Sequence, residues 1–368
     1  MTLRVSGRVA AAATIALAGA MAAAPAAAQK IEGSYICVFN KAAVAKEKVN
    51  ERAQGAANGN GQLKHLYRNS IRGFAVETTP QGLAKIKAKD ASIAYCEQDQ
   101  VVRIVQAKGG TTSQPAQSLP WGIARVGYRN YTGTGRAFVI DSGVDLDHPD
   151  LNVDTALSRS FTSEKTADDG NGHGTHVAGT IAARNNTIGV VGVAAGARVV
   201  AVKVLTRSGS GSNSGVIAGV DYVASIANAN DVANMSLGGG VSQALDNAVV
   251  SAAATSGAAF TLAAGNESDN ANNHSPARAN GTNVYTVSAF ARGDAWASFS
   301  NYGNPPVDWA EPGASILSTY KGGGYATLSG TSMAAPHLAG ILLAGSVVSD
   351  GTVVGDPDGN ADRVGKLQ

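Results

Sequence analysis

From Trp121 onward, short apolar segments alternate with longer segments of helical pattern, and this alternation constrains the fold more than any other feature. Strands are predicted over 137–143, 198–205, 231–239 and 258–266. Helices are predicted between them, over 175–184, 214–228 and 242–257. Such alternation predicts an α/β fold, a mainly parallel sheet flanked by helices, with active residues beyond the carboxyl ends of the strands.

The first third of the chain has a different pattern. Strands are predicted over 33–40 and 93–104, a hairpin over 62–79, and helices over 41–58 and 80–89. The order β-α-β-β-α-β predicts a small ferredoxin-like α+β domain. A segment rich in Gly, Ser, Thr, Gln and Pro, 107–118, predicts a linker. We therefore divide the chain into domains over 29–107 and 108–368.

Residues 1–28 have the composition of a secretory signal peptide. Arg4 and Arg8 precede an Ala-rich apolar run, and small residues lead up to Ala28, where we expect cleavage. A membrane anchor is the alternative, but the run is short and a cleavage-like site follows it at once. We expect a secreted protein, extracellular or periplasmic in transit, without a stable membrane anchor.

The net charge of +2 hides an asymmetry along the chain. Residues 1–107 carry 14 Lys/Arg and 7 Asp/Glu, whereas residues 108–368 carry 15 and 20. Opposite balances of +7 and −5 suggest either electrostatic complementarity between the two parts or ordinary variation of surface charge. Neither balance indicates nucleic-acid binding. The only cysteines, Cys37 and Cys96, could form a disulfide in an exported chain, and the sequence leaves that open.

Three polar strings follow predicted strands or precede predicted helices. Asp141 ends an apolar strand in VIDSGVDLDHPDL, where backbone donors can hold a carboxylate. His173 lies in DGNGHGTHVAG and Ser332 in SGTSMAAPHLAG, where small residues lead into helices. A serine at a helix N-terminus has backbone N–H groups around it and a favourable dipole for a developing oxyanion.

These strings resemble those of the subtilase family of serine proteases, the subtilisin and proteinase K type, and the order Asp, His, Ser is the order known for subtilisins. The resemblance implies a serine endopeptidase that acts on proteins or peptides as a monomer. Ser332 would be the nucleophile, His173 the general base and Asp141 its orienting partner. Asn266 would donate its side-chain amide to the oxyanion. The other five histidines are expected to pack or to lie in loops.

The resemblance also implies where a peptide substrate binds. Two segments would hold an extended peptide as an added strand, Ser210-Gly211 and Ser236-Leu237-Gly238. Ala263, Ala264 and Gly265 would form one wall of the pocket for the residue before the cut, and their small size predicts a wide apolar pocket with no charged floor. The family usually has an aromatic residue where Asn213 stands, which puts an apolar preference four residues before the cut in doubt.

A structural Ca²⁺ site is the second implication. The string RNNTIGV resembles a subtilisin calcium loop, although alone it would be an ordinary Asn-rich turn. By that match the ligands are the side-chain oxygens of Gln117, Asp150 and Asn186 and the carbonyls of Arg184, Ile188 and Val190. Whether Asp308 holds a weaker second ion stays open. The acidic segment 356–362 departs from the EF-hand pattern, and we predict a solvated tail there.

The β-α-β-β-α-β segment resembles the family's inhibitor pro-domain, which assists folding and then blocks the active site with its last strand. The chain would therefore be a zymogen whose partner is its own pro-domain, with self-cleavage within 105–108. A catalytically silent binding protein of the same fold is the main alternative, but every triad and oxyanion position is filled. An α/β-hydrolase esterase would need a G-x-S-x-G elbow and the order Ser, Asp, His.

Overall fold

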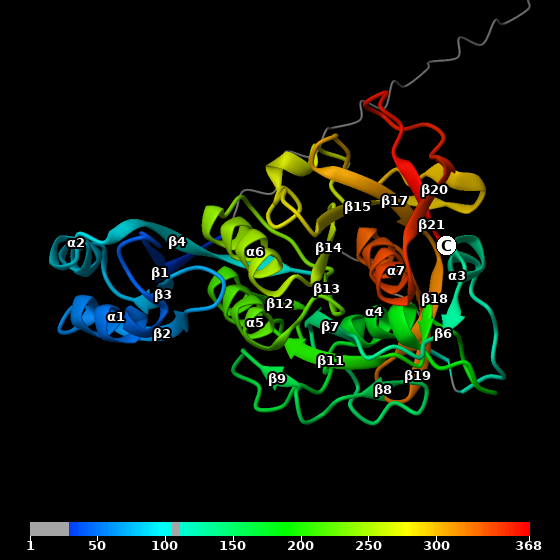
Figure 1. The fold of residues 1–368 in the computed structure, drawn as a ribbon, viewed down its shortest axis with the longest axis horizontal. Helices are drawn as coiled ribbons and strands as arrows, with labels where there is room; N and C mark the ends of the chain where they lie inside the picture. Colours follow the sequence, from blue (N-terminus) through cyan, green and yellow to red (C-terminus); the bar gives the residue numbers. More distant parts are fainter. Residues whose placement is uncertain (1–28, 105–110, 113) are drawn as a thin grey trace, which may run out of the picture.

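The computed structural model describes residues 29–104, 111–112 and 114–368, which form a small lobe and a large lobe (Figure 1). The predicted signal peptide, 1–28, and the predicted cut, 105–108, lie outside the described residues. Within the described part of the chain, no helix is long and apolar enough to cross a membrane.

The large lobe is built on a mainly parallel sheet, as predicted. In spatial order its strands are β20 (Val347–Thr352), β21 (Arg363–Leu367), β17 (Val307–Pro312), β15 (Val284–Ala291), β14 (Ala259–Ala263), β13 (Val232–Met235), β7 (Arg136–Asp141), β11 (Arg198–Lys203) and β8 (Asn152–Val153). Strands β9 (Arg159–Ser160) and β16 (Ala295–Trp296) pair with β11 and β15. Only β16 and β20 pair antiparallel in this sheet.

Helices cover both faces of this sheet (Figure 1). Strand β7 shows why, because Phe138 and Ile140 belong to the core shared with α5 (Asn213–Ile226) and α6 (Gln243–Ser256). The alternate residues Ala137 and Val139 belong to the core shared with α4 (His173–Ala182) and α7 (Thr331–Ala344). Successive strand residues point to opposite faces, so an uninterrupted apolar strand is buried on both sides.

Shorter elements complete the large lobe. They are β5 (Thr111–Thr112), α3 (Trp121–Val126), β6 (Arg129–Asn130), β10 (Ala194–Ala195), β12 (Ser210–Ser212), η2 (Ala271–Asn273), η3 (Arg292–Asp294), β18 (Ile316–Tyr320) and β19 (Gly324–Leu328).

The small lobe has the predicted β-α-β-β-α-β order. Its elements are β1 (Lys30–Phe39), η1 (Lys46–Lys48), α1 (Val49–Ala57), β2 (Gln62–Tyr67), β3 (Gly73–Glu77), α2 (Pro80–Lys89) and β4 (Ile93–Arg103), and its antiparallel sheet has the order β4-β1-β3-β2. Helix α2 has the predicted bounds because Thr79 caps it, accepting from the Gly82 N–H, and Pro80 fits its first turn. The first helix begins later than predicted, after a 3₁₀ turn.

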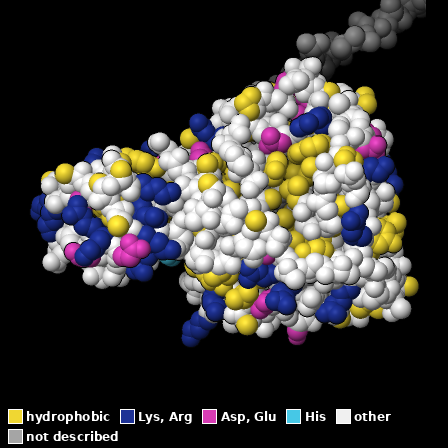
Figure 2. Space-filling view, viewed as in Figure 1, with side chains coloured by type: hydrophobic (Ala, Val, Ile, Leu, Met, Phe, Trp, Pro, Cys, Tyr) yellow, Lys and Arg dark blue, Asp and Glu magenta, His cyan; other side chains and the backbone are white. Residues whose placement is uncertain are grey.

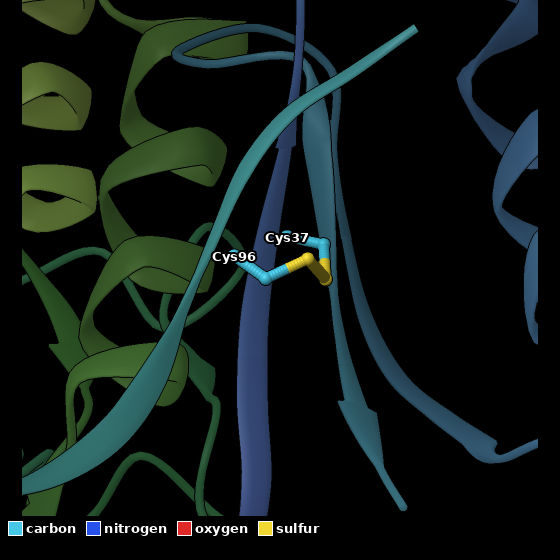
Figure 3. Close-up of a disulfide and its surroundings, with 2 residues drawn as sticks. All are labelled: Cys37 and Cys96. Carbon is cyan, nitrogen blue, oxygen red and sulfur yellow. A yellow bond between two sulfur atoms is a disulfide. The ribbon is translucent and has the colours of Figure 1, made fainter. Parts of the chain in front are cut away.

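Cys37 and Cys96 face each other across β1 and β4, and a disulfide joins them (Figure 3). The sequence had left this pairing open. Cys37 is fully buried in the core of the small lobe, together with Phe39, Phe74 and Ile86. The link therefore fixes β4, the last strand of the lobe, to the lobe's centre.

The prediction of a solvated tail over 356–362 is wrong for its last residue. Asp362 is buried and accepts hydrogen bonds from the Ser288 hydroxyl and the Asn304 amide. The cause is non-local, since β20 and β21 form a hairpin that extends the sheet through a pairing of Ala310 with Val364.

Candidate active site

Asp141 and His173 meet at the carboxyl edge of the large sheet. The carboxylate ends β7 and lies 2.8 and 2.9 Å from the His173 Nδ1, with both side chains fully buried. Within the described residues the Nε2 of His173 has no hydrogen-bond partner. An imidazole held at Nδ1 by a carboxylate keeps Nε2 for proton transfer.

Asp169 holds this pair in place, and sequence reasoning missed it. Its buried carboxylate accepts from the N–H groups of Asn171, Gly172 and Thr175 and from two hydroxyls, those of Ser142 and Thr175. Ser142 follows Asp141, and its hydroxyl also accepts from an N–H of α4. Burial raises the pKa of Asp169. An Asp shortly before a helix start is a capping signal, which could have identified this residue.

Ser332 and Asn266 lie beside each other at the start of α7. The Asn266 side-chain oxygen accepts from the N–H and the hydroxyl of Thr331, both at 2.8 Å, which turns the amide nitrogen away from Thr331. The Ser332 hydroxyl donates to the Ser236 carbonyl at 3.1 Å. Gly265 has a φ of +108°, and a Cβ there would lie 2.2 Å from the Asn301 side chain, so glycine is required before Asn266.

The other histidines of the large lobe are engaged elsewhere. Burial lowers the pKa of His176 to about 3 and that of His337 to about 4, so both are neutral at neutral pH. The rings of His148 and His176 bond to the carbonyls of Gly324 and Ile316. His274 faces Asp269 at 3.3 Å. His173 is therefore the best placed base.

The end of β4 occupies the groove where a peptide was predicted to bind. Strand β4 pairs antiparallel with β12, with Arg103 opposite Ser210 and Val102 opposite Gly211. On the other side, Arg103 and Gly238 exchange two backbone hydrogen bonds of 3.0 and 3.1 Å. The Ile104 N–H donates to the Gly209 carbonyl. The structure thus brings the predicted segments together around an extended strand, as in β-augmentation.

The pocket next to this groove differs from the prediction. Its lining residues are Leu237, Gly238, Gly239, Ala263, Ala264, Gly265, Glu267, His274 and Ala277. Ala263, Ala264 and Gly265 line this pocket, but Glu267 lines it as well, so the prediction of an apolar pocket is wrong. Glu267 and His274 lie in the pocket lining because Asn301 fixes the loop after Asn266. The side-chain oxygen of Asn301 accepts hydrogen bonds from the N–H groups of Glu267 and Asp269. This contact is non-local and leaves no local sequence signal.

Three carboxylates join the two lobes. Glu97 accepts from the Ser242 hydroxyl and the Ala244 N–H at the start of α6, and Asp99 accepts from the Ser214 N–H and hydroxyl at the start of α5. Asp221 of α5 accepts from three successive N–H groups, those of residues 68–70. Burial raises the pKa of Glu97. Among described residues no Lys/Arg–carboxylate ion pair crosses between the lobes, although the small lobe is rich in Lys and Arg (Figure 2).

The segments that carry the predicted calcium ligands meet near Asp150, but only some of the ligands contact it. Its fully buried carboxylate accepts from the Asn186 amide at 2.8 Å and from the Val190 N–H and the Tyr325 hydroxyl at 3.2 Å. The Arg184 N–H donates to the Asp150 carbonyl, and the loop carrying Ile188 pairs with the segment carrying Gln117. The Gln117 amide donates to Asn185. The structure thus brings Asp150, Asn186 and Val190 into contact, and among the described residues it shows no group of three or more His, Cys, Asp or Glu that could hold a metal ion.

Comparisons with known proteins show which family the chain resembles. The profile of the subtilase family matches residues 138–344. The chain is 44% identical over 292 residues to alkaline serine exoprotease A of Vibrio alginolyticus, which covers 76% of this chain and 52%, about half, of the Vibrio protein. It is 40% identical over 291 residues to subtilisin E of Bacillus subtilis (strain 168), covering 77% of this chain and 71% of that protein. A crystal structure of a cold-adapted subtilisin-like serine proteinase matches with a TM-score of 0.59 and 39% identity, over 67% of this chain and 98% of that one.

Proposed function

The chain belongs to the subtilase family and is a serine protease of the subtilisin type, and from this premise we propose that it is a secreted endopeptidase made as an autoprocessed zymogen. The observation that carries the proposal is the buried Asp141–His173 pair, and a strand of the same chain in the predicted substrate groove supports it. Ser332 and Asn266 lie together at the start of α7, where Asn266 accepts from Thr331. The secretion part rests on the composition of residues 1–28.

In the proposed mechanism, Ser332 attacks the scissile carbonyl while His173 takes its proton and passes it to the leaving amine. Asp141 fixes the tautomer of His173 and stabilises its charged form. The Asn266 amide and the Ser332 N–H at the start of α7 stabilise the oxyanion. Water then hydrolyses the acyl-enzyme with His173 again as base. Removing one oxyanion donor costs on the order of 10²–10³ in turnover, a range established on a subtilisin and carried over here.

The small lobe, 29–107, would act as chaperone and inhibitor of the peptidase domain, 108–368. Its support is the pairing of β4 with β12 and Gly238, which extends to Ile104, the last described residue before 111. We place the cut after Val105, the first position of the predicted range 105–108. Calcium would be held near Asp150 and would stabilise the large lobe without taking part in the reaction.

A fluorophosphonate probe tests the proposal against its main alternative, a silent protein of the same fold. The probe reacts only with an activated serine, so the processed chain should be labelled and Ser332→Ala should not. Ser329→Ala, in the turn before α7, is the matched control and should label normally. Lack of labelling of the wild type would favour the binding protein.

A further inference from the structure

Asn213 lies on the same face of the groove as Val102 of the occupying strand. Val102 is directly opposite Gly211 in the pairing of β4 with β12. Ser212 is extended, with φ −119° and ψ 153°, so the residues on either side of it, Gly211 and Asn213, point to the same face. Residues directly opposite in an antiparallel pair share a face, so Asn213 is a diagonal neighbour of Val102. Both side chains are buried, Val102 fully and Asn213 to all but 1%.

The amide of Asn213 has no partner in this buried position. Within the described residues neither its Nδ2 nor its Oδ1 makes a hydrogen bond. Most polar groups around it are bonded elsewhere, although the Oε1 of Gln100 also lacks a partner among the described residues. Ser212 accepts from the Gly215 N–H, Ser214 donates to Asp99, and Gln100 of β4 donates to the Val241 carbonyl. A buried polar group without a partner is costly, and its persistence needs an explanation.

Val102 explains the unpartnered amide, because an isopropyl side chain offers neither donor nor acceptor. Counted from a cut after Val105, Val102 is the fourth residue before the scissile bond. We propose that Asn213 makes this subsite selective for peptides with a hydrogen-bonding side chain, hydroxyl or amide, four residues before the cut. The inference rests on the proposed protease function and specifies its substrate class. The pro-strand is then a poorer occupant of this subsite than a preferred substrate, which favours its replacement after cleavage.

Two internally quenched peptides that differ only by Val or Thr at the fourth position test this inference, since the two side chains are nearly isosteric. Processed wild-type enzyme should cleave the Thr peptide about three to ten times faster in kcat/KM, the effect of one net hydrogen bond. Asn213→Leu should reverse the ratio. The same Val/Thr exchange at the third position is the control and should change little, because Arg103 is exposed there. Mass spectrometry identifies the bond cut.

The full chain offers a second measurement that does not need the Leu variant to fold. Val102→Thr should lengthen the lag between self-cleavage and activity about three- to tenfold, because the freed strand now satisfies Asn213. Equal or faster cleavage of the Val peptide by the wild type would overturn the inference while leaving the protease function intact. Failure to cleave either peptide would instead overturn the proposed function, and this inference with it.

Discussion

The two lobes reach stability in different ways. The small lobe has one core cluster of its own, which contains Cys37, and a disulfide between cysteines 59 residues apart in the sequence. Other buried residues of the small lobe, Ile36, Tyr67 and Ala75 among them, join a core of the large lobe. The large lobe contains no cysteine and has extensive cores on both faces of its sheet. A domain of about 75 residues buries too little surface to be more than marginally stable, and a crosslink offsets this. The large lobe has enough core, but its non-local parallel pairing folds slowly. We infer from this contrast that the small lobe is a stable template on which the slowly folding large lobe can fold.

The contrast is first tested by removing the disulfide. In a Ser332→Ala background that keeps the chain intact, Cys37→Ser with Cys96→Ser should destabilise the small lobe by about 4 kcal/mol in the chain-entropy model. Hydrogen exchange resolved by lobe should show faster exchange in β1 and β4 and unchanged exchange in β7 and β13. Equal protection of the small lobe with and without the disulfide would mean that its core suffices.

Calcium should act on the other lobe. Saturating a site at 100 times its Kd stabilises the folded state by about 3 kcal/mol, so chelation should lower the melting temperature of the large lobe only. Asp150→Ala should have the same effect and make the chelator redundant, whereas exposed Asp147→Ala serves as control. A melting temperature indifferent to chelator would reject the site.

The stability of the protein should depend on pH through Asp246 of α6, and the small lobe contributes to this dependence. Burial raises the pKa of Asp246 to about 6, with Glu97 of the small lobe contributing. A carboxyl group whose pKa is raised on folding contributes its full stability to the folded state below about pH 4. This contribution is lost as the pH rises through 6. Asp246→Asn should therefore add about 3 kcal/mol of stability at pH 8 and almost nothing at pH 4.

The mature enzyme is the comparison for this effect, since it lacks Glu97. The gain at pH 8 should be smaller there than in the Ser332→Ala precursor, as measured by denaturant unfolding at both pH values. An equal gain at pH 4 and pH 8 would show that Asp246 does not titrate in this range. As a control, Glu47→Gln at an exposed position should leave the free energy of unfolding unchanged at both pH values.

The smallest predicted effect comes from the opposite net charges of the small lobe and the mature enzyme. We expect isolated residues 29–107 to inhibit the mature enzyme, and their opposite net charges should make association a few times slower at high salt. Because no ion pair joins the lobes among described residues, the dissociation rate should change less. Stopped-flow kinetics at two salt concentrations separates the rates, and an association rate independent of salt would leave the charge asymmetry without a role.

Local signals explain what the sequence could predict. The uninterrupted apolar run of β7 and Pro80 at the start of α2 are local patterns, and the structure has both elements where they were expected. The strings around Asp141 and His173 are also local, and the structure joins these two side chains. The family resemblance identified these two residues but not Asp169, which holds them in place.

What could not be predicted depends on contacts between distant segments. Asp362 is buried by Ser288 and Asn304, and the charged pocket lining depends on Asn301, none of which is near in sequence. The disulfide required the register of β1 against β4. Asp169 had a local capping signal, but its bond to Ser142 links two separate strings.

The central claim is that the strand in the groove belongs to an inhibitor that the same chain's Ser332 cuts free. N-terminal sequencing and intact mass of wild type and Ser332→Ala, expressed side by side, test it most directly. The wild type should give a mature form that starts just beyond Ile104, within 106–109, and Ser332→Ala should keep residues 29–368 in one piece. A mature start after Ser118 or inside the small lobe, or a processed Ser332→Ala chain, would contradict the account.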